Sequence, residues 1–174
     1  MGADPGQNRP AVRRAEEKIK ILQELIPLLE EIKKRGEKVV FTNGCFDLLH
    51  AGHATYLEEA RLLGDCLVVG LNSDASVQKI KDPPRPILPE AQRALVLASL
   101  EAVDFVILFE DSTPLALIRA LKPNILVKGA DWEEAEIVGG KDMMGWGGEI
   151  RRIPVVSGIS TTAIIERIFD QHKK

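Results

Sequence analysis

The chain has 174 residues, of which 45% are hydrophobic, and its 23 basic residues nearly balance its 26 acidic ones. This length and apolar content suit one globular domain with a substantial core. The near-balance of charge disfavours nucleic acid as the main partner, because nucleic-acid-binding domains usually carry a basic face. The sequence also lacks an apolar run of about 18 residues that could span a membrane. Its two cysteines, Cys45 and Cys66, do not form a Cys-X-X-Cys pair. Free thiols suit a reducing compartment, so we expect a cytoplasmic protein.

The N-terminal part is predicted to precede the main domain. Residues 1–10 lack an apolar signal core, and we expect a flexible lead-in there. Residues 11–35 carry Leu and Ile at helical spacing, which predicts one amphipathic helix. Pro27 should bend or interrupt this helix, and Gly36 should end it. We expect the segment 11–36 to pack against a main domain spanning residues 37–174, in preference to forming a dimer contact.

From residue 37 onward, apolar strand patterns alternate with helical patterns. We expect strands at residues 38–42, 67–71, 105–109, 125–128 and 149–153. We expect helices at residues 53–64 and 89–100, after Thr113-Pro114, and at 161–169. Residues 79–86, rich in lysine and proline, should form an ordered loop. The alternation predicts a Rossmann-like α/β domain whose parallel sheet has about five strands.

A run of polar and glycine residues, 41–53, follows the first expected strand and includes two histidines. The run Phe-Thr-Asn-Gly-Cys-Phe-Asp-Leu-Leu-His-Ala-Gly-His places His50 and His53 where the strand gives way to a helix. Glycines at 44 and 52 would admit a phosphate close to backbone N–H groups, and a helix N-terminus favours an anion. Imidazoles at such a place suit a phosphate whose charge grows during transfer.

Two other interpretations of the histidines remain open. Two histidines three residues apart could ligate zinc, although the remaining histidine, His172, lies in the charged tail and the cysteines are not paired. They could also be ordinary surface or core histidines.

Further candidate residues follow other expected strands. Ser160, Thr161 and Thr162 open the last helix, where hydroxyls and free N–H groups could hold phosphate oxygens; a plain helix N-cap is the alternative. Lys128, Gly129 and Asp131 follow the fourth strand, where the glycine would admit a ligand and the carboxylate could accept hydrogen bonds from sugar hydroxyls. In open α/β sheets, ligands bind in a crevice at these strand ends.

The residues 43–47, 50–53 and 159–162 resemble the two-part signature of the cytidylyltransferase-like nucleotidyltransferases. The resemblance implies that His50, His53 and Lys81 are catalytic. It implies that the nucleotide is bound by Asn43, Gly44, Cys45, Phe46, Gly52, Lys128, Gly129, Asp131, Ser160, Thr161 and Thr162. It implies that the second substrate is bound by Asp47, Asn72, Lys79 and Arg93.

Residues 128–131, Lys-Gly-Ala-Asp, are similar to the Lys-Gly-Gly-Asp of the adenylyltransferases that make ADP-heptose, and this narrower resemblance covers residues from about 18 to 168. It implies transfer of AMP from ATP to D-glycero-D-manno-heptose 1-phosphate, for lipopolysaccharide or surface-glycan precursors. Mg²⁺ would be held mainly by the ATP phosphates, with no metal ligands from the protein. We expect a free-standing domain and a possible homo-oligomer.

Residues 137–146 are expected to form a loose apolar wall that is wide enough for a purine. A cytidylyltransferase that makes CDP-glycerol or another CDP-alcohol is the alternative enzyme. A non-catalytic nucleotide sensor is the alternative outside enzymes.

Overall fold

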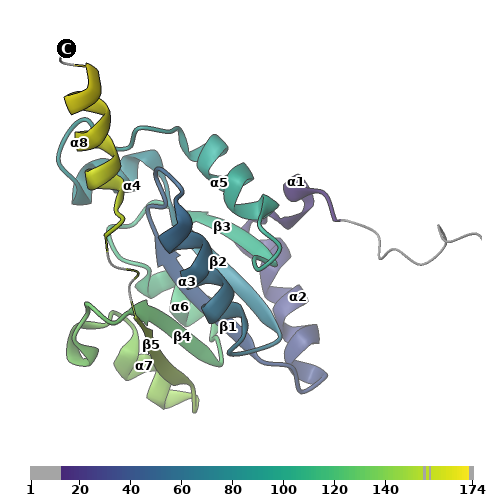
Figure 1. The fold of residues 1–174 in the computed structure, drawn as a ribbon. Coiled ribbons are helices and arrows are strands. Elements are labelled where there is room, and N and C mark those ends of the chain that lie inside the picture. The colour runs from purple at the N-terminus through teal and green to yellow at the C-terminus, as the bar shows by residue number, and fades with distance from the viewer. Residues whose placement is uncertain (1–12, 155, 157, 173–174) are drawn as a thin grey trace, which may run out of the picture.

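The computed structural model describes residues 13–154, 156 and 158–172. Its centre is a five-stranded sheet with the order β3-β2-β1-β4-β5, in which every neighbouring pair is parallel (Figure 1). The strands are β1 (Val39–Gly44), β2 (Cys66–Asn72), β3 (Phe105–Phe109), β4 (Ile125–Gly129) and β5 (Glu149–Ile153). The prediction of a Rossmann-like α/β fold with about five parallel strands is confirmed.

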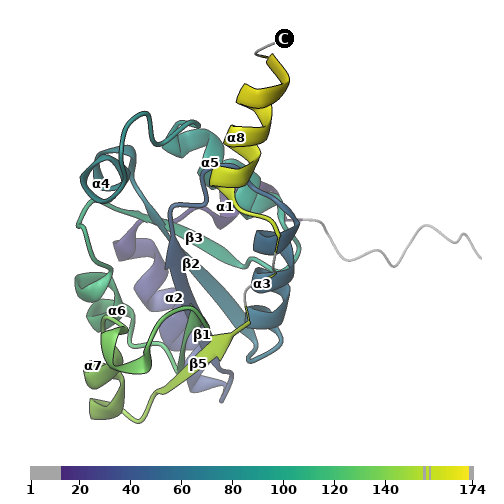
Figure 2. The ribbon, with the colours of Figure 1, turned by 60° about the vertical axis from the view of Figure 1, so that its left-hand side comes forward.

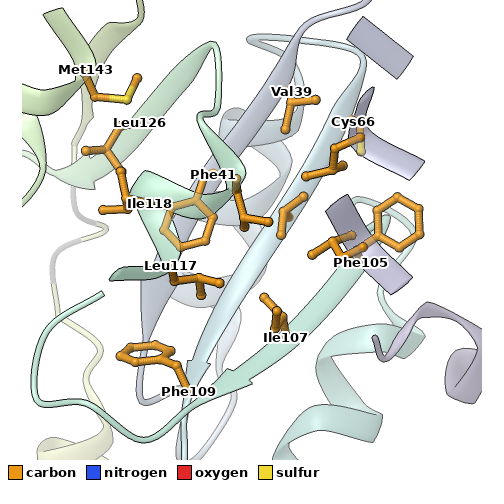
Figure 3. Close-up of a cluster of buried hydrophobic side chains, with 14 of the residues drawn as sticks. Val39, Phe41, Cys66, Phe105, Ile107, Phe109, Leu117, Ile118, Leu126 and Met143 are labelled. Atoms are coloured by element: carbon orange, nitrogen blue, oxygen red, sulfur yellow. The ribbon is translucent and has the colours of Figure 1, made fainter. Parts of the chain in front are cut away.

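Helices cover both faces of the sheet, as Figures 1 and 2 show from two directions. One face packs against α3 (Ala51–Arg61) and α5 (Glu90–Ser99), and the other against α2 (Leu22–Lys34), α6 (Leu115–Leu121) and α7 (Gly140–Gly145). Successive residues of a strand therefore enter different cores. Val39 and Phe41 point toward α2 and α6 (Figure 3), while Val40 packs with the residues of α3. Burial on both faces explains why these strands read as continuous apolar runs.

Three further elements follow strand ends or lie outside the layers. Helix α4 (Asp74–Ile80) begins at Ser73, whose side chain accepts a hydrogen bond from Ser76 N. Lys79 and Ile80 therefore belong to a helix, and the loop predicted from residue 79 begins only at Lys81. A short 3-10 helix, η1 (Glu134–Glu136), follows β4, and α8 (Thr161–His172) extends away from the body of the domain. None of the residues of α8, all of which the structure describes, is buried.

The prediction of one continuous helix over residues 11–35 is wrong for the described residues. Two helices are present, α1 (Ala15–Lys18) and α2, and Ile19 between them forms a parallel bridge with Val106 of the edge strand β3. Lys20 N donates to Val106 O at 2.9 Å, so the chain satisfies an edge-strand carbonyl in place of a helical one. Pro27 lies inside α2 without interrupting it, and Gly36, at φ 79°, follows its end as predicted. Residues 1–12 lie outside the described residues, and the domain boundary at residue 37 stays a prediction.

The sheet separates along its centre toward the carboxyl ends of its strands. β1 pairs with β2 as far as Gly44 and Leu71, and β4 pairs with β5 as far as Gly129 and Ile153. By contrast, β1 and β4 pair only at the two positions Val40–Ile125 and Phe41–Leu126. This is also where the strand order reverses, so a crevice opens at the position where such sheets bind ligands. Within the described residues, no helix combines the length and the apolar character needed to cross a bilayer.

Candidate active site

A cavity of about 600 Å³ lies where β1 and β4 separate. Its lining comes mainly from the loop between β1 and α3, the end of β4 with the residues after it, the start of α8, and the loop after α4. The end of β2 and residues 112–114, after β3, complete it. The cavity lining brings together most of the predicted site residues, namely Asn43, Gly44, Cys45, Phe46, Asp47, His50, Gly52, His53, Asn72, Lys81, Lys128, Gly129, Asp131, Ser160, Thr161 and Thr162.

The two histidines stack at the start of α3. His50 is the N-cap residue and His53 lies in the first turn, with ring centroids 3.9 Å apart and an angle of 22° between the planes. The Nδ1 atom of each ring is buried and has no hydrogen-bond partner among the described residues. A buried polar atom without a partner is costly. Each imidazole is therefore well suited to a ligand that supplies the missing partner.

Both imidazoles are neutral in the ligand-free protein near pH 7. Burial, and to a smaller extent the neighbouring His50, lowers the pKa of His53 to about 4, although a hydrogen bond with the backbone of Leu48 opposes this shift. Burial also lowers the pKa of His50 from its usual value. A neutral imidazole still donates one N–H, and a bound phosphate would raise both pKa values through its negative charge.

Glycine is needed at two positions near the histidines because neighbouring side chains, more than an approaching ligand, occupy the space that a Cβ would fill. A Cβ at Gly44 would lie 3.0 Å from the Phe46 ring, and a Cβ at Gly52 would lie 3.1 Å from the His50 ring and 3.2 Å from Ile159. Phe46 has φ 42°, in the left-handed region, and its ring lies 5.2 Å from that of His53. The glycines thus let Phe46 and the start of α8 approach the histidine pair.

Lys128 connects the two separated halves of the sheet. Its ammonium donates to Asn43 Oδ1 across the gap and lies 5.8 Å from the centre of the Trp132 ring. Burial lowers the pKa of Lys128 to about 8, although the carboxylate of Asp131 opposes this shift. An anionic ligand would stabilise this buried cation, which supports a phosphate-binding role.

The residues at the start of α8 cap the helix and also line the cavity. Ser160 Oγ accepts a hydrogen bond from Ala163 N at 3.1 Å, which is the N-cap bond that the alternative interpretation predicts. Thr161 Oγ1 donates to Leu48 O at 3.5 Å, so the helix start lies beside the loop that carries the histidines. Both residues line the cavity together with Thr162.

Comparison with known proteins decides the family. The family model described as cytidylyltransferase-like matches residues 41–167. The chain belongs to the cytidylyltransferase-like family. The resemblance read from residues 43–53 and 159–162 is thereby confirmed.

Two curated relatives of this cytidylyltransferase-like protein bear the name bifunctional protein HldE. The one from Magnetococcus marinus is 60% identical over 137 residues, which cover 79% of this chain and 28% of that protein. The one from Syntrophotalea carbinolica is 50% identical over 157 residues, which cover 90% of this chain and 32% of that protein. The chain thus spans roughly a third of the length of these relatives.

A solved structure shares the fold as well as sequence. The crystal structure of the lipopolysaccharide core biosynthesis protein from Thermoplasma volcanium GSS1 is 32% identical, with a TM-score of 0.62. The match covers 70% of this chain and all of that one.

Two predicted substrate-binding residues of this cytidylyltransferase-like protein lie outside the cavity. Lys79 lies on α4, and its ammonium donates to Glu110 O at 3.4 Å. Arg93 is buried on α5, where its guanidinium donates to four acceptors, Leu88 O, Cys45 O, Asn72 O and Asp74 Oδ1. These contacts join α5 to the ends of β1 and β2, which is a structural task.

Asp47 and Asn72 line the cavity, but their side chains already have partners. Asp47 accepts hydrogen bonds from Ile87 N, Leu88 N and Arg85 Nε. Burial alone would raise the pKa of Asp47, but the bonds from Leu88, Ile87 and Arg85 outweigh it and hold the pKa below its usual value. Asn72 Nδ2 donates to Ser76 Oγ. Asp47 therefore holds the loop at residues 85–88 in place.

The apolar wall predicted over residues 137–146 is present only at its start, because the rest of the segment does not line the cavity. Residues 140–145 form α7, and Met143 is fully buried in the core beneath α6. Trp146 Nε1 donates to Pro123 O, and of this segment Ile137 and Val138 line the cavity. Met143 therefore serves core packing, whereas Met144 is 73% exposed, and neither lines the cavity.

Sequence reasoning missed Tyr56, Trp132 and Arg85 in the cavity lining. Tyr56 lies one helical turn after His53, its hydroxyl is 2.8 Å from Thr42 Oγ1, and burial raises its pKa to about 12. Its spacing from His53 was a usable signal, because residues three apart share a helix face. Arg85 carried no such signal, since its partner Asp47 is 38 residues away.

The cavity offers few protein ligands for a metal ion. The described residues contain no cluster of three or more His, Cys, Asp or Glu side chains that could hold one. Two carboxylates line the cavity, and Asp47 is fully hydrogen-bonded, which leaves Asp131. This donor set fits a Mg²⁺ ion held mainly by phosphate oxygens, since Mg²⁺ is often bound by one or two carboxylates plus substrate phosphates.

Proposed function

We propose that the protein transfers AMP from ATP to D-glycero-D-manno-heptose 1-phosphate, forming ADP-heptose and pyrophosphate for a lipopolysaccharide or other surface glycan. The observation that carries the transfer chemistry is the neutral, stacked pair of His50 and His53 at the opening between β1 and β4. The choice of substrates rests on the 50–60% identity to the HldE proteins and on the resemblance of residues 128–131 to ADP-heptose-forming adenylyltransferases.

The reaction needs no covalent enzyme intermediate. A phosphate oxygen of the sugar attacks the α-phosphorus of ATP and forms a new O–P bond. The bond between the α-phosphorus and the bridging oxygen to the β-phosphorus breaks, and the electron pair leaves with pyrophosphate. The nucleophile is already an anion, so the protein does not have to remove a proton from it. The remaining task is positioning and charge stabilisation.

Different residues of the cavity perform the positioning and the charge stabilisation. His50 and His53 donate hydrogen bonds to the phosphate oxygens on which charge increases. Lys128 supplies a buried cation, and the hydroxyls of residues 160–162 hold the leaving phosphates. Asp131 is the carboxylate available to a Mg²⁺ ion that the ATP phosphates would mainly hold, and such an ion would offset part of the triphosphate charge.

The nucleotide choice is the most direct test of this proposal. We expect kcat/KM with ATP to exceed that with CTP by at least about tenfold, or ~1.4 kcal/mol. Pyrophosphate release should be measured with each nucleotide and either heptose 1-phosphate or glycerol 3-phosphate, and the latter should be inert. Equal or better turnover with CTP and glycerol 3-phosphate would favour the CDP-glycerol alternative and overturn the assignment.

A further inference from the structure

Arg85 is fixed at the edge of the cavity by a buried carboxylate. Its Nε donates to Asp47, whose side chain is 0% exposed, while the Arg85 side chain is 15% exposed. Ile87 N and Leu88 N complete the hydrogen bonding of Asp47. The bond from Nε to Asp47 therefore fixes the orientation of the guanidinium plane of Arg85.

The two terminal nitrogens of Arg85 have no such partner. In the part of the chain that the structure describes, the hydrogen bonds of Arg85 involve its backbone N and its Nε but neither Nη atom. Arg85 lines the cavity, and its Nη atoms are absent from the buried unpartnered atoms found among the described residues, so they remain accessible. A guanidinium held at Nε presents its terminal N–H groups in one plane, the geometry that matches two oxygens of a phosphate.

A second cation lies at the same end of the cavity. Lys81 also lines it, and the positive charges of Lys81, Arg93 and Arg85 act on the thiol of Cys45, opposed by the carboxylate of Asp47. None of the ion pairs between described residues involves Lys81. Lys81 and Arg85 thus form a positively charged end, distinct from Lys128 on β4.

The positively charged end and the start of α8 reach the same loop, between β1 and α3, from opposite sides of β1 in the sheet, at the neighbouring residues Asp47 and Leu48. The loop of Arg85 follows β2 and α4, whereas α8 follows β5, and β2 and β5 lie on opposite sides of β1 in the sheet. Arg85 reaches the loop between β1 and α3 at Asp47, while the start of α8 reaches it at Leu48 and Gly52. In phosphoryl transfer the attacking and leaving oxygens lie roughly in line on opposite sides of the phosphorus.

We propose that Arg85 binds the phosphate of the acceptor, the sugar 1-phosphate, and presents its oxygen for attack. This inference rests on the proposed function, because it takes the hydroxyls of α8 to hold the leaving pyrophosphate. Asp47 then acts as a positioning residue that orients Arg85.

Arg85→Gln and Arg85→Lys test this role, with Arg119→Gln as the matched control. Arg119 also donates through Nε to a carboxylate, that of Asp142, but lies on α6 outside the cavity. We expect Arg85→Gln to raise the KM for heptose 1-phosphate by about tenfold or more, the loss of a charge-assisted phosphate contact, with the KM for ATP changed less than about threefold. Arg85→Lys should melt like the wild type yet show the same KM defect, because one ammonium cannot serve Asp47 and a phosphate together.

Each other outcome is decisive. A larger change in the KM for ATP would place Arg85 on the triphosphate, and a full rescue of the acceptor KM by Arg85→Lys would make Arg85 only a structural partner of Asp47. Calorimetric titration of heptose 1-phosphate into the wild type and Arg85→Gln separates the two proposals. A wild type that forms no sugar nucleotide overturns the proposed function, whereas equal affinity of the two proteins for the sugar phosphate overturns the role of Arg85.

Discussion

Replacement of His53 by alanine is expected to lower kcat by about two to three orders of magnitude, the loss typical of removing one preorganised donor to a charged transition state. His53 stacks on His50 at the helix start and has a buried nitrogen without a partner among the described residues. The substitution changes no charge near pH 7, because the pKa of His53 is lowered to about 4. The loss of kcat therefore reports on the contact of His53 with the phosphate in the substrate complex, and not on a charge that His53 carries in the free protein.

Steady-state kinetics of His53→Ala should be compared with those of His172→Ala. His172 lies at the exposed end of α8 and should tolerate the change without loss of activity. Circular dichroism and thermal melting of both variants check the fold. A folded His53→Ala protein with wild-type turnover would remove the histidine pair from the mechanism.

Replacement of Arg93 by methionine is expected to lower the free energy of unfolding by about 3–5 kcal/mol, because three backbone carbonyls lose a donor at a cost of about 1–3 kcal/mol each. The side chain of Arg93 is 0% exposed and donates to Asp74 Oδ1 at 2.7 Å. Its other donors satisfy the carbonyls of Cys45, Asn72 and Leu88. Methionine fills much of the volume but leaves all four acceptors without this donor.

Urea denaturation of Arg93→Met and of Arg151→Gln measures this difference. Arg151 forms an ion pair with Glu149 while its side chain is 57% exposed, so its loss should cost no more than about 1 kcal/mol. An Arg93→Met protein of wild-type stability with a raised KM for the sugar phosphate would instead support the family-based prediction that Arg93 binds substrate.

The sheet was predictable because its strands are buried on both faces. Runs such as residues 67–71 and 105–109 are almost wholly apolar, and each forms a strand close to its predicted bounds. The N-terminal helix was predicted less well, because the break at Ile19 depends on Val106, a partner 87 residues away that the local pattern does not reveal. At residues 19 and 20 the backbone pairs with the edge strand β3, and the helix is interrupted there.

The residues of the candidate site could also be predicted only in part from the local sequence. His50 and His53 lie within one short run, so their pairing at a helix start could be predicted from local sequence. The roles of Asp47 and Arg93 could not, because their partners lie between 5 and 48 residues away in the sequence. A charged residue in a family motif position can bind substrate or hold the scaffold, and only its three-dimensional partners separate these roles.

In the proposed reaction, the phosphate of heptose 1-phosphate attacks the α-phosphorus of ATP. Heptose 1-phosphate labelled with ¹⁸O in its phosphate oxygens, incubated with ATP, Mg²⁺ and the protein, tests it by ³¹P NMR and mass spectrometry of the products. We expect ADP-heptose that retains all of the label, together with unlabelled pyrophosphate. Formation of ADP and a heptose bisphosphate, or of no sugar nucleotide at all, would contradict it.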